Sequence, residues 1–187
     1  MKDHDFLAAL ETSNHKLVLA ESCTGGLAVA TLAQIPGISN FLCGSAVTYR
    51  PEAKKDWLGI PDTLIEQYTA ESAEVTQAMC RGVLQQTPEA TIGGAITGHL
   101  GPNAATDKDG VIYISIAKKV GDEIVQVTCV RRVLKEEERV SRQIEASQIL
   151  IKLLQSSLNA HIGAITRGPV IMANDVSVSM RFLNSNH

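Results

Sequence analysis

The sequence predicts an α/β protein, a three-layer α/β/α sandwich on a mixed, mostly parallel sheet. An apolar run at 17–20 leads into a glycine-bearing turn and an Ala-rich helix, which is typical of a buried parallel strand and its connecting helix. Helical and strand-like segments then alternate along the chain. Two β-branched runs and a long helix end the series, so a hairpin is expected to add antiparallel strands.

The first elements follow from hydrophobic spacing and from turn residues. Asp5–Asn14 is expected to be a short amphipathic helix, because Phe6, Leu7 and Leu10 share one face. The segments expected after it are a strand at 17–20, a helix at 27–35, a turn at 36–40, a strand at 41–49, a helix at 52–58 and a short helix from Pro61 and Asp62.

The second half contains the longest predicted elements. Thr69 is expected to cap a helix at 71–86, with Glu71 and Glu74 in the first turns, where the helix dipole favours acidic groups. The segments expected after it are a strand at 91–98, an exposed irregular loop at 99–109, an antiparallel hairpin of 110–117 and 124–133, and a helix at 135–158 with an apolar stripe that includes Ile144 and Leu150.

Composition is typical of a globular protein and excludes several classes. The 187 residues are 44% hydrophobic and 20% charged, with a net charge of −3 and no basic run, so neither nucleic-acid nor membrane binding is expected. The charged N-terminus lacks the apolar core of a signal peptide. Four scattered cysteines give no metal-ligand spacing or disulfide framework. We therefore expect a cytoplasmic protein without metal or cofactor.

The chain divides into one domain and an extension. Residues 1–158 carry the helix–strand alternation and are predicted to form a single domain, whereas residues 159–187 do not follow that rhythm. Strands at 162–165 and 176–180 are one interpretation of the extension. The alternatives are that it covers a sheet edge, reaches a neighbouring subunit or is partly mobile.

The turn after the first strand is the candidate ligand site. Ser22 lies at the carboxyl end of that strand, and Gly25 and Gly26 allow backbone N–H groups to approach a ligand closely. Ligands of open α/β sheets bind at this place, next to a helix N-terminus. The alternative is an ordinary strand-to-helix connection in which Ser22 or Thr24 only caps the helix.

Five segments, in order, carry a resemblance to a known family. They are Ala20–Gly26; Gly37–Phe41 with Gly44 and Tyr49; Glu52–Lys54 with Leu58–Ile60; Thr97–Gly98 with Gly101–Pro102; and Arg139. Together they resemble the CinA C-terminal domain family, the nicotinamide mononucleotide amidohydrolases, over residues 6 to 158. The resemblance implies an α/β/α sandwich, in agreement with the prediction from the pattern.

The resemblance also implies a set of site residues. Members are similar to Ser-Lys hydrolases, which makes Ser22 the nucleophile and assigns proton transfer to Lys54 and Tyr49. A desolvated lysine loses its proton readily and acts as a base. The substrate is expected to be a small nucleotide. The residues expected to bind it are Cys23, Thr24, Gly25 and Gly26 at the turn, Thr97 and Gly98 on the neighbouring strand, and Arg139, which is expected to pair with the phosphate. A homo-oligomer, a dimer or larger, is also expected.

Each assigned residue has a structural alternative. Lys54 is either a base or a solvated surface lysine like Lys55, and Tyr49 either relays a proton or closes the core. Arg139 lies among acidic residues and is either a ligand contact or part of a solvated helix face. Cys23 is a rival nucleophile, because a nearby helix N-terminus lowers a thiol pKa.

The loop at 99–109 departs from the family pattern. The family has Thr-Gly-Ile-Ala-Gly-Pro followed by further glycines, whereas this chain has His99 and Leu100 and lacks the extra glycines. Two hypotheses remain: an amidohydrolase acting on nicotinamide mononucleotide, and a non-catalytic nucleotide-binding or subunit-interaction protein. In the first, His99 lies at the rim and leaves Lys54 in place. In the second, His99 or Leu100 fills the space beside Ser22.

The family's full-length proteins carry a larger N-terminal domain, which this sequence does not contain. Any pyrophosphatase activity associated with that domain is expected to be absent.

Overall fold

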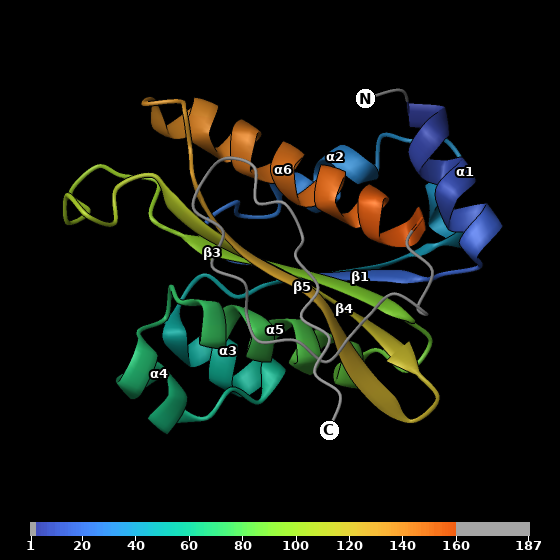
Figure 1. Cartoon of the computed structure of the whole chain (residues 1–187), viewed down its shortest axis with the longest axis horizontal. Coiled ribbons are helices and arrows are strands. Elements are labelled where there is room, and N and C mark those ends of the chain that lie inside the picture. Colours follow the sequence, from blue (N-terminus) through green and yellow to red (C-terminus); the bar gives the residue numbers. More distant parts are fainter. Residues whose placement is uncertain (1–2, 160–187) are drawn as a thin grey trace, which may run out of the picture.

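A five-stranded mixed sheet lies at the centre of the computed structural model, which describes residues 3–159 (Figure 1). Residues 160–187, and with them the two strands expected in the extension at 159–187, lie outside the described residues. The elements in chain order are α1 (Asp3–Ser13), β1 (Leu17–Glu21), α2 (Leu27–Leu32), a 3₁₀ turn (Ile38–Asn40), β2 (Leu42–Val47), α3 (Pro51–Leu58), α4 (Asp62–Tyr68), α5 (Ala73–Gln86), β3 (Ile92–Gly98), β4 (Val111–Val120), β5 (Glu123–Val133) and α6 (Arg139–Asn159).

The strand order is β2-β1-β3-β4-β5, and only part of the sheet is parallel. β1 pairs in parallel with β2 and β3, whereas β3–β4 and β4–β5 are antiparallel. The α/β class and the mixed sheet are confirmed, but the prediction of a mostly parallel sheet is wrong. A parallel pairing of β3 with β4 would need a crossover connection, and the segment between these two strands is a loop without a helix.

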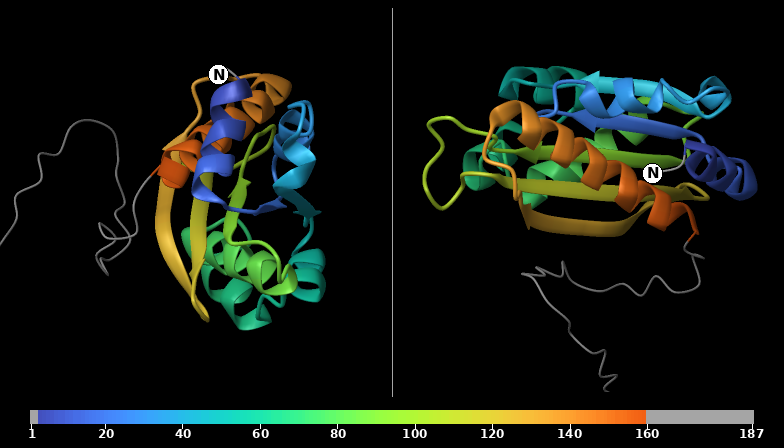
Figure 2. Two further views of the ribbon diagram at one scale, coloured as in Figure 1. Left: turned by 90° about the vertical axis from the view of Figure 1, so that its right-hand side faces the viewer. Right: turned by 90° about the horizontal axis from the view of Figure 1, so that it is seen from above.

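Helices cover both faces of the sheet (Figure 1, Figure 2). One apolar core joins α1, α2 and α6 to one face through Phe6, Leu32 and Leu150, and the other packs α3 and α5 on the opposite face through Leu58 and Met79. Ile144 was expected in the apolar stripe of α6 but is 45% exposed. The connection after β1 leads to α2 on one face of the sheet, and the connection after β2 leads to α3 on the opposite face.

A pair of glycines in β3 lets both layers approach the sheet closely. A Cβ on Gly93 would lie 2.7 Å from Leu84 of α5, and one on Gly94 would lie 3.2 Å from Leu154 of α6. Successive strand residues face opposite sides of a sheet, so each glycine serves one layer. The central strand is thereby buried on both faces.

The three parallel strands end at the same edge of the sheet. The register pairs Glu21 with Val47 of β2 and with Ile96 of β3, so the residues after these positions lie side by side. Because the connections from β1 and β2 cross to opposite faces, this edge is the point where open α/β sheets bind ligands. Ser22 lies directly at it.

The described residues include no helix that is both long and apolar enough to cross a membrane. Within the same residues, no three His, Cys, Asp or Glu side chains come together as a metal site would require.

Candidate active site

A buried carboxylate organises the turn after β1. Glu21 is fully buried, and its oxygens accept five hydrogen bonds. The donors are Thr24 Oγ1 (2.7 Å), Ser45 Oγ (3.2 Å) and the backbone N–H groups of Gly26 (3.1 Å), Ala28 (3.1 Å) and Val29 (2.9 Å). Backbone N–H groups at a helix start have no partner within the helix. Glu21 therefore caps α2, the part that the sequence assigned to Ser22 or Thr24.

We expect Glu21→Gln to lower the free energy of unfolding by about 2–4 kcal/mol, since a buried amide cannot accept all of these bonds and turns its own N–H groups toward donors. Urea denaturation of both proteins measures the difference. The exposed Glu11 on α1 provides the control, because Glu11→Gln removes a carboxylate that caps nothing. Equal midpoints for the Glu21 variant and the wild type would contradict the capping role.

Ser22 and Lys54 meet in the interior at the end of β1. Lys54 Nζ donates to Ser22 Oγ at 3.0 Å and to the backbone oxygen of Thr48 at 2.9 Å. Lys54 is fully buried and Ser22 is 5% exposed. The two residues are 32 positions apart in the sequence. The structure thus brings together the predicted nucleophile and base, and Lys54 is not a surface lysine.

Helix α3 aims the lysine inward. Pro51 starts the helix, a position where its missing N–H costs nothing, and Lys54 and Leu58 are its buried residues. Residues four apart share a helix face, so Leu58 anchors the face that carries Lys54. The neighbouring Lys55 points to solvent and pairs with Asp62.

Burial changes the acidity of the lysine. Desolvation lowers the pKa of Lys54 below its ordinary value of 10.5, because the charged ammonium loses water, and the carboxylate of Glu71 opposes part of this shift. A lysine with a lowered pKa spends more time as the neutral amine, the form that accepts a proton.

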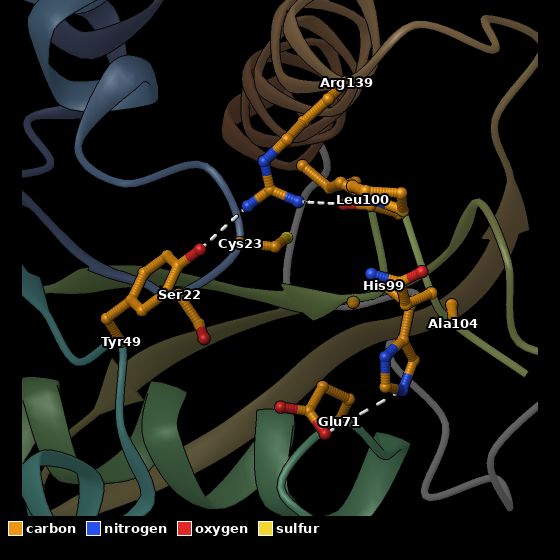
Figure 3. A pocket seen from close by; sticks show the side chains of 12 residues that line it. Ser22, Cys23, Tyr49, Glu71, His99, Leu100, Ala104 and Arg139 are labelled. Carbon is orange, nitrogen blue, oxygen red and sulfur yellow. Dashed lines mark hydrogen bonds and ion pairs between the residues drawn. The ribbon is translucent and has the colours of Figure 1, made fainter.

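A pocket of about 230 Å³ opens in front of Ser22 (Figure 3). Its walls come from the turn after β1, the segments that follow β2 and precede α5, the end of β3 with the loop after it, and the start of α6. The lining residues are Ser22, Cys23, Tyr49, Glu71, Gly98, His99, Leu100, Gly101, Pro102, Asn103, Ala104 and Arg139.

Tyr49 and Arg139 meet across the mouth of the pocket. An Arg139 guanidinium N–H donates to Tyr49 Oη at 2.8 Å, and a second donates to the backbone oxygen of Gly101 (Figure 3). Tyr49 is 54% exposed, so it does not close the core. Within the described residues its hydroxyl makes no hydrogen bond to Ser22 or Lys54. The arrangement places a cation at the entrance, next to a hydroxyl that remains able to donate.

Four of the predicted binding residues do not line the pocket. The Thr24 hydroxyl and the Gly26 N–H donate to Glu21, and the Gly25 N–H donates to the backbone oxygen of Ser22. Thr97 is fully buried, and its hydroxyl bonds that of Thr76 at 2.8 Å. Within residues 3–159, the backbone N–H groups of Cys23 and Thr24 donate no hydrogen bond. Of these two turn residues, only Cys23 lines the pocket, so its N–H is the donor that the turn offers a ligand.

Cys23 is a poor rival to Ser22. Its thiol is buried, and desolvation raises the pKa to about 12, with only a partial opposing effect from its own backbone N–H. The expectation that the helix N-terminus would lower this pKa is wrong, because loss of water outweighs the dipole. The thiolate is therefore scarce at neutral pH.

His99 lies on the pocket wall away from Ser22. Figure 3 shows its ring directed toward Glu71, with the Ser22 side chain on the other side of the pocket. The backbone of His99 is fixed by two bonds at 2.9 Å, from its N–H to Val111 and from the Gly110 N–H to its carbonyl oxygen. The Lys54–Ser22 hydrogen bond is intact, as the catalytic hypothesis requires.

An ion pair holds the loop at 99–109 to α6. Arg142 donates to both carboxylate oxygens of Asp109, at 2.8 and 2.9 Å, and Arg142 is only 8% exposed. Two parallel N–H···O bonds fix orientation as well as distance. Leu100 is 3% exposed, so the loop has an apolar anchor as well. The sequence predicted an irregular loop but gave no sign of this attachment.

The chain is similar to known proteins over most of its described length. The family model of the CinA C-terminal domain matches residues 2–158. A putative competence-damage inducible protein of Moorella thermoacetica is 37% identical over 155 residues, covering 82% of this chain and 36% of that protein. A CinA-like protein of Geobacter metallireducens is 43% identical over 107 residues, 56% of this chain and 26% of that protein. The chain thus spans about a third or less of the length of these relatives.

Solved structures share the fold. The competence/damage inducible protein of Agrobacterium tumefaciens superposes with a TM-score of 0.75 at 23% identity, over 84% of this chain and 93% of that chain. A CinA superfamily protein of Klebsiella pneumoniae gives 0.74 at 25% identity, over 83% and 94%. The two-layered packing of helices on the mixed sheet is therefore an established architecture.

Proposed function

The chain belongs to the CinA C-terminal domain family, and from that premise we propose that it is an amidohydrolase that converts nicotinamide mononucleotide to nicotinate mononucleotide and ammonia. The observation that carries the proposal is the 3.0 Å contact between Ser22 Oγ and the fully buried Lys54 Nζ. A serine needs an adjacent base to become a nucleophile, and a desolvated lysine supplies one.

In the first half of the reaction, the neutral Lys54 amine accepts the Ser22 proton while Ser22 Oγ attacks the carboxamide carbon. The C–N bond of the tetrahedral intermediate then breaks, and the Lys54 ammonium returns the proton to the departing ammonia. Thr48 holds Nζ through its carbonyl oxygen, which keeps the amine aimed at Ser22. An ester between Ser22 and the nicotinoyl group remains.

In the second half, water attacks the ester with Lys54 again as the base. Both tetrahedral intermediates carry a negative oxygen, and we assign its stabilisation to the backbone N–H of Cys23, which lines the pocket next to Ser22. Release of the acid returns the proton to Ser22. Water is the only co-reactant that the cycle consumes.

The phosphate of the substrate is assigned to Arg139. A guanidinium has five donors, and Arg139 uses two of them on Tyr49 and Gly101, which leaves donors for phosphate oxygens. Tyr49 adds a hydroxyl beside the guanidinium. The wall formed by His99 leaves the space next to Ser22 open, which supports the catalytic hypothesis over the non-catalytic one.

Ammonia release from nicotinamide mononucleotide by the purified protein tests the proposal directly. We expect one equivalent of ammonia for each equivalent of nicotinate mononucleotide. His99→Ile serves as the comparison, since it restores the residue of the family pattern. An inert wild type together with an active His99→Ile variant would show that the loop blocks the site, and would favour the non-catalytic function.

A further inference from the structure

One wall of the pocket carries charges that the proposed reaction does not use. Glu71 lies just before Ser72, which caps α5, and His99 follows β3. His99 Nε2 and Glu71 Oε2 are 3.8 Å apart, and the two side chains are 27% and 28% exposed (Figure 3). The sequence placed Glu71 inside the helix as a dipole-favoured acid, but the helix starts two residues later and leaves this carboxylate facing the pocket.

The carboxylate is available to a ligand. At 3.8 Å the contact with His99 is longer than a hydrogen bond, and the buried Nε2 atom has no hydrogen-bond partner among residues 3–159. Within the described part of the chain, Glu71 accepts no hydrogen bond from any other group. Its oxygens therefore line the cavity without being committed to the protein.

Glu71 also decides the charge balance of the pocket. It is the only carboxylate among the described lining residues, whereas Arg139 lies at the mouth and Lys54 lies behind Ser22. The Glu71 charge reaches the reacting groups, because it raises the pKa of both Lys54 and Cys23. Without Glu71, a positively charged substrate would meet only cations here.

We propose that Glu71, with His99 beside it, makes this pocket selective for amides carried on a positively charged ring. The inference rests on the proposed function, in which the amide lies at Ser22 and the anionic end of the substrate lies on Arg139. A ring that lies between Ser22 and Arg139 then faces the pocket wall that carries Glu71. The substrate class is a dipolar amide with a cationic ring and a distant anion, rather than any nucleotide amide.

The test compares two ligands that differ only in ring charge and reduction. Nicotinamide mononucleotide has a cationic pyridinium ring, and its 1,4-dihydro form keeps the phosphate, ribose and carboxamide on a neutral ring. Titration calorimetry with the Ser22→Ala protein measures binding without turnover. We expect an added Glu71→Gln change to weaken binding of the cationic ligand by about fivefold, the effect of one charge pair near a surface, and binding of the neutral ligand by less than about twofold.

The control variant is Glu74→Gln, which removes the same charge from the first turn of α5 at an exposed position outside the pocket lining. It should leave both affinities unchanged, and thermal unfolding should show that both variants are folded. Equal weakening of both ligands by Glu71→Gln, or weakening of neither, overturns the inference while the proposed function stands. If Ser22→Ala binds neither ligand, the proposed function fails and the inference fails with it.

Discussion

Replacement of Ser22 by alanine is expected to reduce ammonia release by about 10⁴-fold or more, since removal of a nucleophile eliminates the covalent route and leaves only binding and polarisation of the amide. The protein should remain folded. The change removes one hydrogen bond, from Lys54 Nζ, and that amine keeps the Thr48 carbonyl oxygen as a partner. The cost in unfolding free energy is then about 1 kcal/mol.

Steady-state kinetics and urea denaturation of the same preparations separate loss of chemistry from loss of fold. Cys23→Ala is the paired variant, because it removes the neighbouring thiol and keeps the serine. We expect Cys23→Ala to retain turnover within about tenfold of the wild type, as its thiol carries little thiolate. Undiminished turnover in Ser22→Ala would assign the nucleophile to Cys23 or to water instead.

Local patterns were sufficient for the elements but not for the direction of every strand. The run at 17–20 and the β-branched runs near the C-terminal helix both became strands, because apolar and β-branched stretches have few other stable places in a small domain. Whether β4 pairs in parallel with β3 depends on the connection between them. A loop that returns directly produces an antiparallel pair, and only the folded chain shows that β4 is the neighbour of β3.

The Ser22–Lys54 pair was reached through family resemblance rather than through spacing. Nothing in a lysine 32 residues away indicates that α3 will turn it toward the end of β1. Spacing does show that Lys54 and Leu58 share a face, but not that the face is buried. Burial of a charged side chain depends on contacts between segments distant in the chain, which a single sequence does not display.

The roles of two acidic residues, Glu21 and Glu71, could not be predicted from residue type alone. Glu21 stands at the end of an apolar strand, where its five hydrogen bonds come from groups up to 24 residues away. Glu71 was assigned to a helical first turn, and Ser72 proved to be the cap. In both cases the sequence contained a residue whose side chain accepts hydrogen bonds from a helix start. Glu21 follows the apolar run at 17–20 directly, and Ser72 is a common capping residue just before the helix.

Lys54→Met is expected to reduce kcat/KM for nicotinamide mononucleotide by about 10³-fold or more. Methionine fills most of the same buried volume but accepts no proton, so Ser22 loses its base. Lys55→Met is the matched control, because Lys55 is adjacent and exposed and forms a surface ion pair with Asp62. That surface pair contributes about 1 kcal/mol at most, and the control should keep wild-type activity. A similar loss in both variants would remove Lys54 from the mechanism.

The pH dependence supplies a second, independent measurement on the same lysine. The neutral amine is the active form, so kcat/KM should rise with pH and level off above the folded-state pKa of Lys54. Since burial lowers this pKa from 10.5, the rise should lie at lower pH than an ordinary lysine would give. The unfolded chain also binds more protons at this position between the two pKa values, so this lysine makes the fold more stable as pH rises through that range.

Glu71 provides a further test of whether Lys54 is the titrating group. Its carboxylate raises the pKa of Lys54 against the larger effect of burial, so Glu71→Gln should lower the pKa further. The rising limb of kcat/KM should then move to lower pH, whatever happens to its height. Profiles of the wild type, Glu71→Gln and Glu74→Gln measured in one buffer series give the comparison. A limb that stays in place in Glu71→Gln, or moves to higher pH, would mean that the titrating group is not Lys54.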